Sequence, residues 1–125
     1  MTVLIAVFVG GGLGSLARLF LAGGIGRITS ISFPWGILVV NVLGGLAMGV
    51  IVELGALKLN YTPELRAALT TGFLGGFTTF SAFSLDTALL IERGDWLNAA
   101  LYVTASVVLS IGALFAAMWA IRSLV

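Results

Sequence analysis

The sequence contains no cysteine and no histidine, and it has few charged residues. The absence of cysteine excludes disulfides and thiolate nucleophiles, and the absence of histidine removes the usual ligands of haem, zinc and copper. Six basic and five acidic residues give a net charge of +1, which favours neither nucleic acid nor a polybasic lipid-binding surface. No base and nucleophile form a recognisable arrangement, so we expect no enzyme activity.

Apolar residues dominate the chain. They make up 60% of its 125 residues, and the mean hydropathy is +1.19. A water-soluble core of this size cannot bury so much apolar surface. Four stretches with at most one charge each are long enough to cross a bilayer core of about 30 Å as helices. We expect an all-α integral membrane protein in which residues 1–125 form one transmembrane domain. The expected spans are residues 3–23, 33–52, 67–91 and 96–121.

The connections between these spans are short, at residues 24–32, 53–64 and 92–95. None can form a separate domain, so function must reside in the helices themselves. The amino terminus has no basic residue before its apolar run. We therefore interpret it as the start of the first span rather than as a cleavable signal peptide.

Positive charge does not distinguish the two ends of the spans. Three basic residues lie on the amino-terminal side, and three lie on the other side or lean toward it. They are Lys58, Arg66 and Arg122 on the first side, and Arg18, Arg27 and Arg93 on the second. The positive-inside rule therefore selects no orientation. Two oppositely inserted copies could pair about an axis in the membrane plane, and the resulting eight helices could enclose a pore more readily than four.

Three pairs of glycines have the GxxxG spacing that permits close contact between helices in lipid. The pairs are Gly10 with Gly14, Gly45 with Gly49, and Gly72 with Gly76. They suit the assembly of two copies, and they equally suit the packing of any membrane bundle. The sequence leaves both interpretations open.

Polar side chains inside the spans are costly unless they are hydrogen-bonded. Asn41 either bonds a neighbouring backbone carbonyl or offers its amide donors to an anion. Tyr102, Ser106 and Ser110 follow i, i+4, i+8 spacing and form one polar stripe along the fourth span. A single serine usually bonds back to its own helix, but three hydroxyl groups in line favour a path for a polar solute.

Two charged side chains lie within the spans, and each has more than one interpretation. Arg18 either extends its charge to the interface or forms an electropositive vestibule that concentrates anions. Asp86 lies near the end of the third span, where it could pair with a basic group or cap a neighbouring helix. We favour a structural role for Asp86.

The centre of the third span, residues 70–87, reads TTGFLGGFTTFSAFSLDT. Three glycines at residues 72–76 weaken the helix, and Thr78 and Thr79 are good caps for a new helix that begins at about Phe80. This pattern predicts a transmembrane helix that is broken near its middle. The backbone groups freed by the break are tolerable only where they bind an ion, line a cavity or are bonded by protein.

GFLGGFTTFSAF, at residues 72–83, closely resembles the GFxGGxTTFSTF signature of the Fluc (CrcB) family of bacterial fluoride channels. The resemblance covers the full chain in length, in number of spans, and in the placement of Arg18, Asn41 and the polar stripe. It implies an antiparallel dual-topology homodimer in the bacterial inner membrane, with two fluoride pores. Such a protein would export fluoride passively from the cytoplasm and relieve fluoride toxicity.

The resemblance also implies roles for individual residues. A structural sodium ion at the dimer centre would be held by the backbone carbonyls of Gly75 and Thr78 from both copies, and Arg18 would lie near the aqueous vestibule. The residues that match the fluoride pore are Asn41, Phe80, Ser81, Phe83, Tyr102, Ser106 and Ser110. The two phenylalanines would face fluoride with the positive edges of their rings.

One position departs from the family pattern. Ala82 stands where the family usually has threonine, so one hydroxyl is missing beside the phenylalanines. Because alanine is small and favours helix, we expect an intact fold and sodium site but reduced fluoride throughput.

Alternative functions fit the sequence less well. A small dual-topology proton-coupled multidrug transporter needs a carboxylate within the membrane, whereas Glu53 and Asp86 lie at span ends. A non-transporting assembly protein would not need the polar stripe or the broken helix. Exchange of fluoride for protons would need a titratable relay, and the sequence shows no such relay.

Overall fold

The computed structural model describes residues 1–29 and 32–125, which form four long helical spans joined by short connections. The first, second and fourth spans are α1 (Thr2–Ile28), α2 (Trp35–Leu57) and α6 (Trp96–Leu124). The third span comprises α3 (Pro63–Ala67), the π-helical segment η1 (Ala68–Leu74), α4 (Gly75–Phe77) and α5 (Phe80–Glu92). All four spans are long and apolar enough to cross a membrane, which confirms the all-α, four-span prediction.

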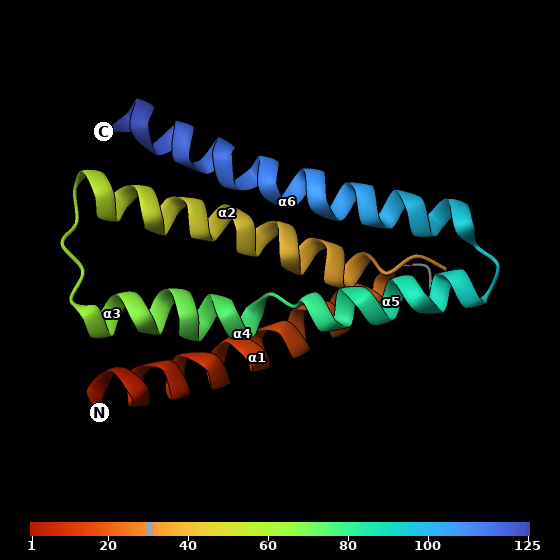
Figure 1. Ribbon diagram of the computed structural model, residues 1–125, viewed down its shortest axis with the longest axis horizontal. Helices are drawn as coiled ribbons and strands as arrows, with labels where there is room; N and C mark the ends of the chain where they lie inside the picture. Colours follow the sequence, from red (N-terminus) through yellow and green to blue (C-terminus); the bar gives the residue numbers. More distant parts are fainter. Residues whose placement is uncertain (30–31) are drawn as a thin grey trace.

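The spans run in alternating directions, with both termini and the α2–α3 connection at the same end (Figure 1). α1 packs along η1 and α4, whereas α2 packs along α6, and α5 packs against the first half of α6. Large apolar side chains such as Phe8, Phe20 and Phe115 are exposed on the outside of the bundle. Such a surface is stable in contact with lipid and unfavourable in water.

Two of the expected connections are wrong in part, because the helices continue into them. α1 extends to Ile28 and α2 extends to Leu57, so residues 24–28 and 53–57 are helical. Residues 30–31 of the first connection lie outside the described residues. Backbone groups in apolar surroundings have no water to bond, so the helical hydrogen bonds persist even through a glycine-rich segment.

A buried carboxylate joins α2 to α6 at the end of the bundle that carries the termini. The Arg122 Nε atom lies 2.6 Å from Glu53 Oε1, and Arg122 Nη2 lies 3.3 Å from Glu53 Oε2. Glu53 is only 5% exposed, so the bidentate bonds from Arg122 replace the water that its carboxylate has lost. We expected the second span to end at residue 52, just before Glu53. The ion pair explains how α2 can include this acidic residue and continue to Leu57.

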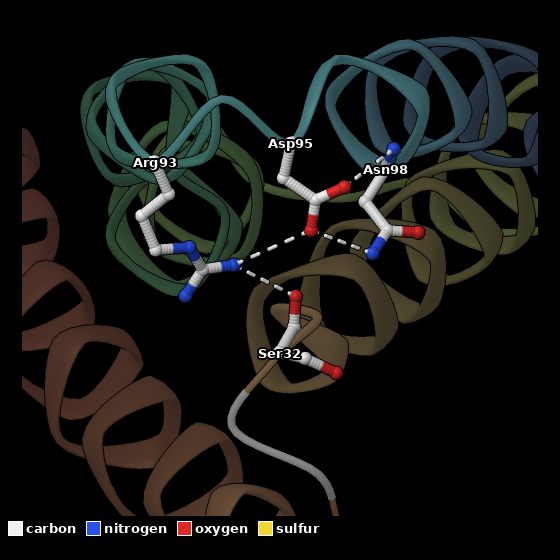
Figure 2. Close-up of polar contacts among 4 residues, drawn as sticks. All are labelled: Ser32, Arg93, Asp95 and Asn98. Carbon is white, nitrogen blue, oxygen red and sulfur yellow. Dashed lines mark hydrogen bonds and ion pairs between the residues drawn. The ribbon is translucent and has the colours of Figure 1, made fainter.

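The opposite end of the bundle is tied together by polar contacts of the α5–α6 turn (Figure 2). Arg93 donates from Nη2 to the carbonyl oxygen of Ser32 at 2.9 Å, and it lies 3.8 Å from the Asp95 carboxylate. Asp95 caps α6 by accepting from the backbone N–H and the side-chain amide of Asn98. Gly94 has a φ of +78°, which glycine adopts without steric cost. The turn therefore connects α5 and α6 to the start of α2.

Glycines allow α1 to approach the third span closely. A Cβ atom at Gly10 would lie 2.5 Å from the Ala68 carbonyl oxygen, and one at Gly14 would overlap the Phe73 carbonyl group. Across the same interface, a Cβ atom at Gly76 would overlap backbone atoms of α1. Two of the GxxxG pairs thus face each other within one chain.

The third pair serves the contact between α2 and α6. A Cβ atom at Gly45 would lie 2.5 Å from the Ser110 carbonyl oxygen, and one at Gly49 would overlap the Leu114 carbonyl oxygen. All three GxxxG pairs are therefore used for packing within one chain. Of the two interpretations left open by the sequence, the packing of the bundle itself is the one that the structure supports.

We predict that Gly14→Ala destabilises the protein by about 1–3 kcal/mol, because the added methyl group forces α1 away from η1. Thermal unfolding of the purified protein in detergent measures the effect. Gly12→Ala is the matched control on the same helix, since a Cβ atom at Gly12 has no neighbour within 4 Å among the described residues. Equal melting temperatures for the two variants would contradict the prediction.

Candidate functional site

The third span is interrupted at Thr78 and Thr79, near its middle. Their backbones are extended, with φ −81° and ψ 159° at Thr78 and φ −152° and ψ 126° at Thr79. α5 begins at Phe80, and the Thr79 hydroxyl caps it by accepting from the Ala82 backbone N–H at 3.1 Å. The predicted break and the start of the new helix are confirmed, and Figure 1 shows the extended segment between α4 and α5.

The attribution of the break to glycines is wrong. Gly72 lies in η1 and Gly75 and Gly76 lie in α4, so all three precede the extended residues and have helical backbones. Gly72 and Gly76 contact α1 instead. The interruption arises at the threonines, because the hydroxyl of Thr79 replaces a missing helical acceptor for the first turn of α5.

The freed backbone of Thr79 is bonded by Asn41 of α2. The Asn41 amide donates from Nδ2 to the Thr79 carbonyl oxygen at 3.1 Å, and Asn41 Oδ1 accepts from the Thr79 N–H at 2.9 Å. This reciprocal pair substitutes for the hydrogen bonds that a neighbouring helical turn would have made. The backbone interpretation of Asn41 is therefore present in the structure, and one amide hydrogen remains for a further acceptor.

The neighbouring carbonyls are the pair that the resemblance assigns to sodium. The Thr78 carbonyl oxygen accepts a long hydrogen bond of 3.4 Å from Arg18 Nη1. Among the described residues, no donor bonds the Gly75 carbonyl oxygen, and Gly75 is exposed. Backbone carbonyls freed at a helix end are hard oxygen ligands, so their chemistry fits an alkali cation.

An open groove of about 700 Å³ lies beside the break. The expected site residues along it are Asn41, Gly75, Thr78, Phe80, Phe83, Ser106 and Ser110. They come from α2, the third span and α6, so the fold brings together residues that are far apart in the sequence. Phe80 is 79% exposed and its ring centroid lies 5.5 Å from that of Phe83, so the two rings form part of the same wall.

The groove contains two hydroxyl groups with no hydrogen-bond partner. The Oγ atoms of Ser106 and Ser110 are buried, and neither has a partner among the described residues. Other hydroxyls in the spans do bond back to the carbonyl four residues earlier. These are Thr29, Thr70, Thr78, Ser84, Thr87 and Ser123. Ser106 and Ser110 are therefore groove-lining residues whose buried hydroxyls are not used by any described protein group.

Tyr102 lies farther along the stripe but does not line the groove. It is completely buried, and its hydroxyl donates to Asp86 Oδ2 at 3.1 Å. Its ring centroid lies 5.2 Å from that of Phe83, so it supports one wall of the groove from behind. Asp86 thus pairs with a phenol, whereas we expected a basic group or a helix end.

Ser81 and Ala82 also lie outside the lining of the groove. Ser81 is exposed, and its hydroxyl lies 3.2 Å from the Thr79 hydroxyl. Ala82 contributes its backbone N–H to the cap of α5. This bond uses the backbone of residue 82 and not its side chain, so alanine and threonine can both make it. The bond is therefore compatible with the intact fold that we expect for the present sequence.

Comparison with known proteins gives the chain a family. The family model described as "CrcB-like protein, Camphor Resistance (CrcB)" matches residues 5–118. The chain belongs to this family. It is 52% identical over 125 residues to the fluoride-specific ion channel FluC of Rhodospirillum centenum, with 100% of this chain and 99% of the relative covered. It is 50% identical to the fluoride-specific ion channel FluC of Rhizobium etli over 119 residues, 95% of each chain.

Gly44 is a residue of the site in this CrcB-like chain that we did not identify from the sequence. A Cβ atom at Gly44 would overlap the Thr78 methyl group, so only glycine lets α2 approach the break so closely. Gly44 follows Asn41 by three residues and shares its helix face, a spacing that could have identified it. Thr70 and Thr71 also line the groove without having been singled out.

We predict that Asn41→Ala lowers the stability of this CrcB-like protein by about 2 kcal/mol or more, because it leaves the N–H and carbonyl of Thr79 without partners. Thermal unfolding in detergent measures this loss. Asn60→Ala, in the exposed α2–α3 connection, is the control that makes the same substitution away from the break. If both variants melt together with the parent protein, the Asn41 bonds do not stabilise the break.

Proposed function

We propose that this protein is a fluoride-selective passive ion channel that exports fluoride from the cytoplasm. The observation that carries the proposal is the pair of buried, unbonded hydroxyls of Ser106 and Ser110 beside two phenylalanine rings in one groove. The names of the relatives in Rhodospirillum centenum and Rhizobium etli support it. We place the protein in the inner membrane of a bacterium, where such a channel relieves fluoride toxicity.

Fluoride is a small anion that must exchange its water for other hydrogen-bond donors as it crosses the membrane. The hydroxyls of Ser106 and Ser110 supply two donors one helical turn apart, and the remaining amide hydrogen of Asn41 supplies another. The ring edges of Phe80 and Phe83 carry partial positive charge and offer weaker contacts. Selectivity against larger halides follows from the narrow spacing of this donor array.

A single subunit leaves the groove open, so we propose that a second copy closes it. The two copies would insert in opposite directions, as the balanced distribution of basic residues between the two ends permits. The highly exposed ring of Phe80 would then be covered by the other subunit. By two-fold symmetry, such an antiparallel homodimer has two equivalent fluoride paths.

We also propose that the carbonyl oxygens of Gly75 and Thr78 in the two copies hold one structural sodium ion. The exposed Gly75 carbonyl and the loosely bonded Thr78 carbonyl support this assignment. Bound sodium would supply a fixed positive charge and would join the two helix breaks. These residues would otherwise leave partial negative charges facing each other at the contact between the copies.

The alternative of a proton-coupled multidrug transporter lacks an available carboxylate. Glu53 is bound by Arg122 through two atoms, and Asp86 accepts from the buried hydroxyl of Tyr102. A carboxylate that alternates between a proton and a cationic drug must be exposed to a cavity that can hold the drug, whereas the cavity that Asp86 lines is small, about 120 Å³. The groove beside the break contains neither of them.

Liposomes loaded with potassium fluoride test the proposed function. We expect the reconstituted protein to release fluoride when valinomycin is added, because potassium movement then balances the charge, and a fluoride electrode records the release. Chloride-loaded liposomes should show no comparable release. Fluoride release that needs a proton gradient, or no release at all, would overturn the channel proposal. The same assay with Ala82→Thr tests whether the missing hydroxyl reduces throughput.

The double variant Ser106→Ala, Ser110→Ala is predicted to slow fluoride release by about tenfold or more. A hydrogen bond to a charged group contributes about 1.5–3 kcal/mol, and about 1.4 kcal/mol corresponds to a tenfold change in rate. Ser84→Ala is the matched control, because the Ser84 hydroxyl already bonds the Phe80 carbonyl oxygen at 2.9 Å. Equal rates for the double variant and the control would exclude the two serines from the path.

A further inference from the structure

Arg18 makes an unusual contact for a charged side chain within a membrane span. Its Nη1 atom donates to the Thr78 carbonyl oxygen across 3.4 Å, from α1 to the break in the third span. Hydrogen bonds from a guanidinium group to oxygen are normally about 2.7–2.9 Å long when they are strong. The Arg18 bond is therefore a loose one, although the surroundings of the break are largely apolar.

Thr78 has a contact with α1 and also lines the groove. Arg18 reaches it from α1 and does not line the groove, whereas Gly75 and Thr78 both line the groove. A cation held by the carbonyls of Gly75 and Thr78 would come from the groove side. The guanidinium and the cation would then lie on opposite sides of one oxygen atom.

Two positive charges that share one oxygen repel each other strongly where water is excluded. A carbonyl oxygen has two lone pairs, so geometry alone does not forbid both contacts. Electrostatics does oppose two simultaneous contacts. The attraction of each positive group to the partial negative charge of the oxygen is smaller than the repulsion between two full positive charges a few ångströms apart.

We propose that Arg18 competes with the central cation for the Thr78 carbonyl. In the separate subunit, Arg18 bonds this carbonyl and satisfies a backbone group that the break has freed. When two copies assemble around sodium, the cation takes over the carbonyl and Arg18 withdraws toward the aqueous end of α1. Arg18 thus lowers the sodium affinity of the dimer and stabilises the unassembled subunit. The inference rests on the sodium site of the proposed function.

A sodium titration of the purified dimer tests this competition without any measurement of fluoride flux. The melting temperature is recorded by the fluorescence of the three tryptophans while sodium chloride replaces choline chloride at constant ionic strength. Arg18→Gln removes the charge and keeps an amide donor. We expect its half-maximal sodium concentration to fall by about tenfold relative to the parent protein, because the repulsion is gone.

Arg27→Gln is the matched control, since it removes an exposed arginine from the last turn of the same helix. Its sodium dependence should equal that of the parent protein. An unchanged or higher half-maximal concentration for Arg18→Gln would overturn the competition and indicate that Arg18 positions the carbonyl for the ion. If the melting temperature of the parent protein does not depend on sodium, both the sodium site and this inference are wrong. The fluoride-release assay tests the channel function separately.

A second measurement needs no variant and covers the case in which Arg18→Gln does not assemble. An experimental structure of the parent dimer in sodium should show the Arg18 guanidinium beyond hydrogen-bond distance of the Thr78 carbonyl, compared with 3.4 Å in the single subunit. A structure with both the guanidinium and sodium on that oxygen would overturn the proposal.

Discussion

The reciprocal bonding of Asn41 with the Thr79 backbone is the interaction on which the site depends. A transmembrane helix can be interrupted only if protein groups replace the hydrogen bonds that the interruption removes. Asn41 accepts from the N–H and donates to the carbonyl of the same residue, so one side chain satisfies both backbone groups. The extended segment at Thr78 and Thr79 is thereby held as a defined conformation and the groove beside it has a fixed wall.

This interaction in turn depends on how closely the helices approach one another. Asn41 can reach the break because Gly44, one turn along α2, leaves space for the Thr78 methyl group. On the other side, Gly14 lets α1 contact the backbone of η1, which brings Arg18 within reach of the Thr78 carbonyl. Glycine is thus used here for its small size, since close packing of helices in lipid replaces the hydrophobic driving force that is present in water.

Local signals made part of this arrangement predictable from the sequence. The four spans follow from apolar length, and the start of α5 follows from Thr79, whose hydroxyl accepts from a backbone N–H only three residues away. The partner of the Thr79 backbone lies 38 residues away, so no local pattern could choose between the two interpretations of Asn41. The misassigned role of the glycines has the same origin, because their contacts are with α1 and cannot be seen within the third span.

The π-helical segment η1 gives this region an unusual tolerance of a one-residue change in chain length. A π-helix holds more residues per turn than an α-helix, and such a segment can arise from the insertion of a single residue into an ordinary helix. Loss of one residue between Ala68 and Leu74 would therefore allow regular α-helix in place of η1 while the residues beyond it keep nearly the same orientation, because the wider turn had absorbed the extra residue. A single deletion in η1 would thus change the local contacts between η1 and α1 and leave the orientation of α5 largely as it is.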